Sequence, residues 1–326
     1  MDGTAPTLPV FTDVLTAAAR IAPHAHVTPV LRSRSLDALA GCELHFKCEP
    51  LQRSGAFKFR GACNAVWALS EDDAVRGVVT HSSGNHGAAL ALAARSRGIA
   101  CHVVVPEGAV AAKLAAIAAY GATLHRCAPS IAAREATAAQ VQRDTGATFV
   151  HPYTDPRVIA GQGTVALELL NATGGLDAMV VPVGGGGLAS GCALAIAGQA
   201  SACRLLLAEP AGAADTARSL AAGRREIDFV PDTICDGLRG SLGAPGFALL
   251  QAHGVGIAMV DDDATIAALR LLWSRLKLLV EPSSAIALAA VLQQREQLQG
   301  KRVGVVLSGG NVDLAAAAQW FASSSA

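Results

Sequence analysis

The chain has 326 residues, of which 52% are hydrophobic and 16% are charged, a composition that excludes intrinsic disorder and suits one large or two medium domains. Lysine plus arginine and aspartate plus glutamate each total 26, and aromatic residues make up only 4%. Neither a nucleic-acid partner nor a base-stacking surface is therefore expected.

Short β-rich runs alternate along the chain with stretches of helical length. The expected strands are Gly77–His81, Cys101–Val105, Thr123–Cys127, Thr148–His151, Ala178–Val183, Cys203–Glu209, Gly256–Val260 and Arg302–Leu307. Asn85–Arg97 is rich in alanine and is followed by Gly98, a common helix-ending residue. Asp261–Leu279 opens with three aspartates and carries apolar residues at helical spacing. This alternation predicts an α/β fold with mostly parallel sheets flanked by helices.

The expected strands divide into two sheets near residue 150. The turn-rich segment from His151 to Pro156 is the predicted crossing point between them. We therefore expect a small domain at residues 77–150 and a large domain formed by residues 1–76 and 151–326.

Membrane insertion and secretion are not expected. The uncharged stretch that begins at Ala178 contains Pro182 and four consecutive glycines, which would interrupt a membrane helix. The N-terminus lacks a basic region followed by an apolar core. The eight cysteines are scattered without a C-x-x-C pair, so we expect reduced core cysteines in a cytoplasmic protein.

Two unusual segments lie in the first third of the chain. Residues 54–61 read SGAFKFRG, which places Lys58 between two phenylalanines. An apolar setting lowers the pKa of a lysine and frees its amine for Schiff-base chemistry, although a surface lysine with aromatic neighbours is an equal alternative. Residues 80–87 read THSSGNHG and join a strand to a helix, where hydroxyl and N–H groups suit a carboxylate. An ordinary helix cap is the alternative there, and His86 alone is more typical of a structural histidine.

Two glycine-rich segments follow later strands. Residues 183–188 read VGGGGL, and such a run suits backbone N–H groups that surround a phosphate at a helix N-terminus. The same run fits the dinucleotide pattern G-x-G-x-x-A, with Glu209 ending the next strand, so a nicotinamide dehydrogenase is a competing hypothesis. Residues 307–313 read LSGGNVD, for which a plain glycine turn is the alternative.

Together, SGAFKFRG, SSGNHG, GGGGL and SGGN, in this order, resemble the pyridoxal-phosphate enzymes of the tryptophan-synthase-like fold, the fold-type II group. Within that group, the chain resembles the serine/threonine dehydratase and serine racemase branch from about Thr28 to Asp313. The resemblance implies two domains, each with a mostly parallel sheet flanked by helices. It also demotes the nicotinamide hypothesis, which explains only one of the four segments.

The resemblance assigns cofactor-binding roles residue by residue. Lys58 would hold pyridoxal phosphate through a Schiff base and serve as the general base, and Phe57 would pack beside the ring. Asn85 would bond the 3′ oxygen, and Ser308 would meet the pyridine nitrogen. The cofactor phosphate would be held by Gly184, Gly185, Gly186, Gly187 and Leu188.

The resemblance also assigns the substrate site. The loop that holds the substrate carboxylate would comprise Ser82, Ser83, Asn85 and His86. Arg134 would face the entrance of the site, and Ser83 would be the acid/base group on the ring face opposite Lys58. Gly240 departs from the pattern, because related racemases often have a serine there, and Ser241 follows directly.

A divalent cation is implied by a third set of residues. Racemase-like members bind one through an acid, a main-chain carbonyl and a second acid, which here match Glu209, the Ala213 carbonyl and Asp215. Hard oxygen ligands suit Mg²⁺ or Ca²⁺, and a solvated pair of acids is the alternative.

The expected activity is that of a pyridoxal-phosphate-dependent ammonia-lyase. It would dehydrate and deaminate L-threonine, L-serine or a related β-hydroxy amino acid such as 3-hydroxyaspartate or phenylserine to a 2-oxo acid and ammonia. A serine racemase is the main alternative, and a nicotinamide oxidoreductase or a catalytically inactive binding protein ranks below it. A homodimer is expected by resemblance.

Overall fold

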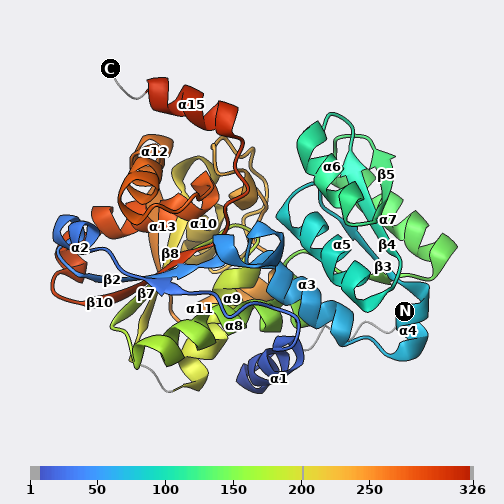
Figure 1. Cartoon of the computed structure of the whole chain (residues 1–326), viewed down its shortest axis with the longest axis horizontal. Coiled ribbons are helices and arrows are strands. Elements are labelled where there is room, and N and C mark those ends of the chain that lie inside the picture. The colour runs from blue at the N-terminus through green and yellow to red at the C-terminus, as the bar shows by residue number, and fades with distance from the viewer. Residues whose placement is uncertain (1–7, 200–201, 324–326) are drawn as a thin grey trace.

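The computed structural model describes residues 8–199 and 202–323, whose strands form two sheets (Figure 1). In spatial order the six-stranded sheet comprises β1 (Val30–Leu31), β2 (Glu43–Cys48), β10 (Arg302–Leu307), β7 (Ala178–Pro182), β8 (Arg204–Pro210) and β9 (Gly256–Val260). The four-stranded sheet comprises β5 (Thr123–Cys127), β4 (Cys101–Pro106), β3 (Val78–His81) and β6 (Thr148–Phe149). Strand pairs are parallel except β1 with β2. This confirms the predicted α/β architecture.

Helices cover both faces of the six-stranded sheet, as parallel strands require. One apolar core lies between this sheet and α2 (Arg34–Ala40), α12 (Asp262–Leu271) and α13 (Pro282–Gln293). The other lies beneath α1 (Phe11–Ile21), α8 (Pro156–Thr173), α9 (Gly187–Gly198) and α11 (Ala244–Ala252). Three further helices lie at the periphery: α10 (Asp215–Ala222), α14 (Arg295–Leu298) and α15 (Leu314–Ser323).

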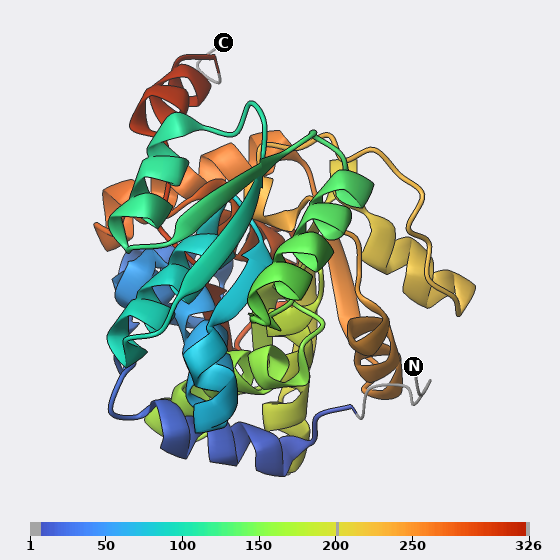
Figure 2. The same ribbon diagram turned by 90° about the vertical axis from the view of Figure 1, so that its right-hand side faces the viewer.

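The four-stranded sheet is likewise enclosed. One face packs with α3 (Lys58–Trp67), α4 (Glu71–Arg76), α5 (Asn85–Arg97) and α6 (Ala111–Ala119). The other face packs against α7 (Ile131–Thr145), which Figure 2 shows on the opposite side of the sheet from α5 and α6. Short turns of helix join several of these elements: η1 (Glu49–Leu51), η2 (Arg53–Gly55), η3 (Ala211–Ala213), η4 (Asp236–Leu238) and η5 (Leu272–Leu276).

Most predicted elements have the observed positions, and one helix was predicted too long. The bounds of β5, β9, β10 and α5 match the prediction, whereas β1 and β2 were not predicted. The predicted helix Asp261–Leu279 is wrong at its C-terminal end. The α-helix ends at Leu271, and one π turn follows to Leu276. The next residue, Lys277, has a left-handed backbone (φ +59°), which ends the helical stretch. The Trp273 indole donates to the Val280 carbonyl at 3.1 Å and holds the chain beyond it.

The four unusual sequence segments all follow the carboxyl ends of parallel strands. They lie after β2, β3, β7 and β10. Ligands of open parallel sheets bind at this edge. The topology therefore predicts one site to which both sheets contribute.

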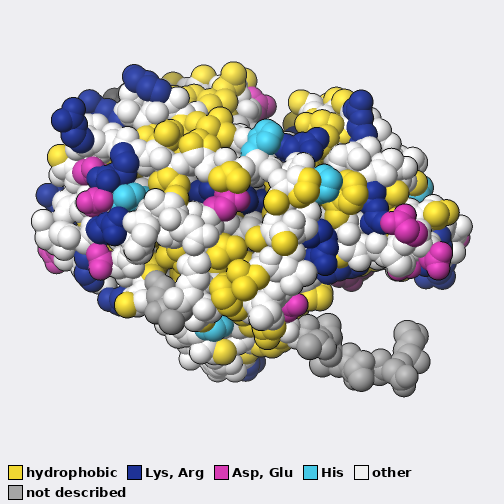
Figure 3. Space-filling model, turned by 60° about the horizontal axis from the view of Figure 1, so that its bottom comes forward, with side chains coloured by type: hydrophobic (Ala, Val, Ile, Leu, Met, Phe, Trp, Pro, Cys, Tyr) yellow, Lys and Arg dark blue, Asp and Glu magenta, His cyan; other side chains and the backbone are white. Residues whose placement is uncertain are grey.

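The surface agrees with the balanced composition. On the face shown in Figure 3, basic and acidic side chains are interspersed. Within residues 8–199 and 202–323, none of the helices combines the length and apolarity needed to cross a bilayer. All eight cysteine side chains are buried.

Candidate active site

Lys58 begins α3, at the positive end of that helix. Its Nζ atom donates to the Pro152 carbonyl at 3.1 Å and lies 5.1 Å from the centroid of the Phe57 ring. Burial lowers the pKa of Lys58 to about 8, and the carboxylate of Glu281 opposes that effect. The neutral amine, which a nucleophile or base requires, is therefore more populated at neutral pH than in an ordinary lysine.

A buried network of charges anchors the first turn of α3. The Arg60 guanidinium, which is fully buried, donates to both oxygens of Glu49 at 2.8 Å and to Glu168 at 2.5 Å. Lys47 donates to the other oxygen of Glu168 at 2.5 Å. Two cations and two carboxylates thus balance, and loss of any one would leave a buried charge unpaired. The network holds in place the helix end that carries Lys58.

The lysine segment and the SGGN segment are joined backbone to backbone. The Phe57 N–H donates to the Ser308 carbonyl at 2.9 Å, and the Gly310 N–H donates to the Gly55 carbonyl at 2.9 Å. Gly55 has φ +75°, and a Cβ atom there would lie 2.5 Å from the side chain of Asn311. The lysine segment therefore requires glycine at position 55. The Ser308 hydroxyl is buried between them and donates to the Ser283 carbonyl at 3.3 Å.

Asn85 links the two sheets. Its Nδ2 atom donates to Glu281 at 2.9 Å (Oε1) and 3.2 Å (Oε2), and its Oδ1 atom accepts from Asn311 at 2.9 Å. Burial, followed by the nearby charge of Asp236, raises the pKa of Glu281 to about 7. The sequence analysis missed Glu281, because an acid before a proline at a helix start is a common cap, and here its side chain does not cap the helix.

The glycine run is required by close approach to Tyr153. A Cβ atom on Gly185 would lie 2.5 Å from the Tyr153 ring, and one on Gly187 would lie 3.0 Å from the Tyr153 Cα atom. Gly186 has φ +89°, and α9 begins directly after it without a side-chain cap. Tyr153 was also missed, because its role depends on contacts with residues more than 30 positions away.

The backbone at this loop fits a phosphate. The first N–H groups of α9 have no acceptor within the helix, and the glycine run that leads into the helix carries no side chain of its own. The Lys58 amine and the Ser308 hydroxyl follow β2 and β10 of the six-stranded sheet, and the Asn85 amide follows β3 of the four-stranded sheet. The donor set therefore fits pyridoxal phosphate.

The predicted carboxylate loop joins β3 to α5. Ser82 and Ser83 are half-buried there, and the Gly84 N–H donates to the Ser82 hydroxyl at 3.4 Å. His86 is buried, with Nε2 3.3 Å from the Val150 carbonyl and Nδ1 without a partner among the described residues. Burial, and secondarily Lys58, holds the pKa of His86 well below its usual value, so this ring is neutral.

Arg134 lies on α7, near His81, the residue that precedes the carboxylate loop. The Arg134 Nε atom is buried and has no hydrogen-bond partner among the described residues. A guanidinium near His81 adds positive charge beside the predicted carboxylate loop.

The segment after β6 is a tight loop held by His151. Its Nδ1 atom accepts from the Tyr153 N–H at 3.3 Å and from the Thr154 N–H at 3.2 Å. Burial, followed by His81, lowers the pKa of His151 to about 4. The predicted strand Thr148–His151 ends at Phe149, two residues earlier than expected. The reason is that His151 turns the chain, and the Pro152 carbonyl then reaches Lys58.

The predicted metal ligands lie at the end of β8 and the start of α10. Glu209 and Asp215 are fully buried; Glu209 accepts from the Thr216 N–H at 2.6 Å, and Asp215 accepts from the Leu242 N–H at 2.7 Å. The second oxygen of Asp215 has no partner among the described residues, and burial raises the pKa of Glu209 to about 7 and that of Asp215 to about 6. Two buried acids that lie near each other, one with an unpartnered oxygen, fit a hard cation. Three or more His, Cys, Asp or Glu side chains do not gather as a metal site anywhere in the described residues.

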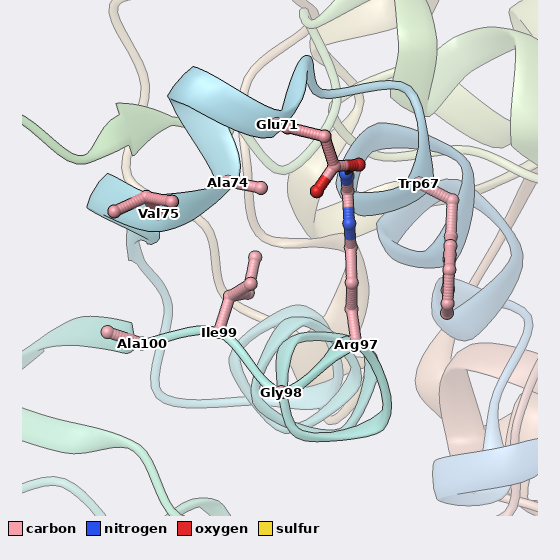
Figure 4. A pocket seen from close by; sticks show the side chains of 8 residues that line it. All are labelled: Trp67, Glu71, Ala74, Val75, Arg97, Gly98, Ile99 and Ala100. Atoms are coloured by element: carbon pink, nitrogen blue, oxygen red, sulfur yellow. Dashed lines mark hydrogen bonds and ion pairs between the residues drawn. The ribbon is translucent and has the colours of Figure 1, made fainter.

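A separate pocket of about 390 Å³ lies at the other ends of α3 and α5 (Figure 4). Figure 4 shows Arg97 reaching from the end of α5 to Glu71, beside Trp67 at the end of α3. The Arg97 guanidinium is already bonded to Glu71 at 2.7 Å and to the carbonyls of Val66 and Leu69. This pocket is remote from Lys58, and its charges are paired within the fold.

Comparison with known proteins gives consistent results. The family model described as "Pyridoxal-phosphate dependent enzyme" matches residues 21–309. A β-hydroxyaspartate dehydratase of Paracoccus denitrificans is 47% identical over 94% of this chain and 98% of its own length. A solved maize serine racemase is 43% identical with a TM-score of 0.93 and covers 97% of this chain and 98% of its own. A solved serine racemase from Dictyostelium discoideum is 44% identical with a TM-score of 0.89, over 94% and 99% of the two chains.

Proposed function

The chain belongs to the family of pyridoxal-phosphate dependent enzymes, and from that premise we propose that it is an ammonia-lyase that dehydrates and deaminates β-hydroxy amino acids. The products would be a 2-oxo acid and ammonia. One observation carries the proposal: a lysine with a depressed pKa lies where four strand-end loops meet, beside a glycine-lined helix N-terminus.

The cofactor, when bound, withdraws electrons from the substrate α-carbon and so acidifies its proton. The residues that would hold it are Lys58 by a Schiff base, the glycine loop at the phosphate, Asn85 at the ring oxygen and Ser308 at the ring nitrogen. The freed amine of Lys58 would take the α-proton, because its pKa near 8 suits a general base at neutral pH. The hydroxyl of Ser308 would turn from the Ser283 carbonyl to donate to the ring nitrogen, and as a neutral partner it would leave that nitrogen largely unprotonated, which favours expulsion of a β-hydroxyl.

Serine racemisation is the second candidate. Two observations support it: Ser83 stands in the predicted carboxylate loop, and the maize relative is named a serine racemase. Racemisation needs a second acid/base group on the face opposite Lys58, whereas elimination does not.

A β-hydroxy amino acid with a second carboxylate is the substrate that we propose first. Arg134 supports this choice as a cation near His81, the residue that precedes the carboxylate loop. The Paracoccus denitrificans relative is named for such a substrate. Threonine and serine are the comparison substrates.

We also propose that Glu209, the Ala213 carbonyl and Asp215 bind Mg²⁺ or Ca²⁺. Asp215 holds the Leu242 N–H, and the neighbouring Gly243 N–H donates to the Gly185 carbonyl at 3.2 Å. A cation at Asp215 would therefore stabilise the segment that supports the glycine loop.

The test is a substrate panel for wild type and Ser83→Ala. Release of 2-oxo acid from 3-hydroxyaspartate, threonine, serine and phenylserine measures elimination, and chiral analysis of serine measures racemisation. We expect elimination to dominate, and Ser83→Ala to retain most dehydration of L-substrates while losing interconversion of D- and L-serine. If wild type mainly interconverts the enantiomers, the racemase is the correct function. Racemisation that survives in Ser83→Ala would instead show that another group serves the second face.

A further inference from the structure

We propose that Glu281 is a positioning residue of this site, which fixes the orientation of the Asn85 amide and supplies the negative charge that faces Lys58. The inference rests on the proposed function only in taking Asn85 as a cofactor ligand. It explains a buried carboxylate and one glycine of the SGGN segment, neither of which the proposed mechanism uses.

The hydrogen bonds permit only one orientation of the Asn85 amide. The Ser54 carbonyl accepts from Asn311 Nδ2 at 2.8 Å, and the same nitrogen donates to Asn85 Oδ1 at 2.9 Å. Asn85 Nδ2 must then face Glu281, to which it donates at 2.9 and 3.2 Å. A flipped amide would oppose oxygen to carboxylate at one end and nitrogen to nitrogen at the other. Glu281 thus sets which Asn85 atom is presented to a ring oxygen.

The fold reserves space for this carboxylate. Glu281 is only 4% exposed, and its N–H donates to the Gly309 carbonyl at 3.0 Å. A Cβ atom on Gly309 would lie 2.8 Å from Glu281 Oε1. The second residue of SGGN is therefore glycine because the carboxylate lies against it, and not because a turn requires a left-handed conformation, which Gly309 does not adopt.

The charges around Glu281 come from three elements. Lys58 on α3 interacts with it, and so do Asp236 on η4 and Lys113 on α6. Lys113 and Asp236 form an ion pair with each other, so their charges largely cancel. Lys58 is then the cation that the Glu281 carboxylate balances. Because burial raises the pKa of Glu281 to about 7, this balance changes within the physiological range.

Two substitutions separate charge from position. Glu281→Gln keeps the shape and removes the charge, whereas Glu281→Asp keeps the charge and withdraws it from Asn85. The measured quantity is the midpoint of the pH titration of the visible absorbance of protein loaded with pyridoxal phosphate. Cofactor affinity and the separate kcat and KM values are also measured.

We expect Glu281→Gln to lower the titration midpoint by about one pH unit or more, because a nearby negative charge stabilises the protonated nitrogen at Lys58. Glu281→Asp should leave the midpoint within about 0.3 pH units, since its charge remains, yet weaken cofactor binding and kcat about tenfold or more. Asp262→Asn is the matched control, because Asp262 is a half-buried acid that also accepts two hydrogen bonds, at 2.6 and 2.9 Å, away from Lys58.

An unchanged midpoint in Glu281→Gln would overturn the charge role. Wild-type cofactor affinity and kcat in Glu281→Asp would overturn the positioning role. These outcomes are distinct from failure of the proposed function, in which the wild type would mainly interconvert the serine enantiomers and release little 2-oxo acid.

Discussion

Acid should destabilise this protein through His151, and the sign follows from the fold. Burial, followed by the charge of His81, lowers the pKa of His151 from the ordinary 6.5 to about 4, and its Nδ1 atom accepts two N–H bonds that require the neutral ring. A base with a depressed folded pKa contributes full stability above pH 6.5 and loses it as the pH falls toward 4. At about 1.4 kcal/mol per pH unit, the free energy of unfolding should fall by about 2 kcal/mol between pH 7 and pH 5.

The matched variant is His151→Asn, whose Oδ1 atom can accept the same two bonds but does not titrate. In urea denaturation at pH 5, 6 and 7, the free energy of unfolding of this variant should fall less with acid than that of the wild type. The difference should be about 2 kcal/mol at pH 5. His253→Asn is the control, because His253 is exposed. Burial also depresses the pKa values of His81 and His86, so part of the acid sensitivity should remain. The same pH dependence in wild type and His151→Asn would refute this reasoning.

The remaining predictions concern the lysine and the cation. Lys58→Ala should fold, yet show no protein-bound visible absorbance with pyridoxal phosphate and no adduct fixed by borohydride. The control variant Lys301→Ala should show both. An unchanged protein spectrum in Lys58→Ala would contradict the Schiff-base assignment. Chelation should lower the melting temperature and Mg²⁺ should restore it, because a cation at 100 times its dissociation constant stabilises by about 2.7 kcal/mol. Asp215→Asn should abolish that response, and insensitivity of wild-type melting and turnover to EDTA would mean that the two acids bind no cation.

The sequence predicted those features that short segments encode. The alternation of strands and helices predicted the α/β architecture, since each element's apolar pattern is local. The glycine runs marked loops at strand ends, because four consecutive glycines are costly unless backbone atoms must approach closely. A different local feature singled out Lys58: its two aromatic neighbours, which suggest an apolar setting that lowers the pKa of a lysine. The family resemblance then supplied the roles that the residue patterns left open.

The features that were missed depend on contacts between distant segments. The role of Glu281 depends on its hydrogen bond with Asn85, 196 positions away. The residues next to Glu281 in the sequence do not distinguish it from a helix cap. Tyr153 and His151 lie in a segment that was interpreted only as a crossing point between sheets. Strand β1 has two residues, too few for any alternation to be visible. In each case the information lies in the tertiary structure and not in a local pattern.

The choice between elimination and racemisation involves both sheets. The segment that carries Lys58 follows β2 of the six-stranded sheet and is joined to the SGGN segment by the backbone of Phe57 and Gly55, whereas Ser83 follows β3 in the four-stranded sheet. Polar contacts between these parts include Asn85 with Glu281, Asn85 with Asn311, and Lys113 with Asp236. The position of a hydroxyl relative to the lysine therefore depends on these contacts as well as on the presence of a serine. A serine in the SSGN loop therefore does not by itself establish the racemase alternative.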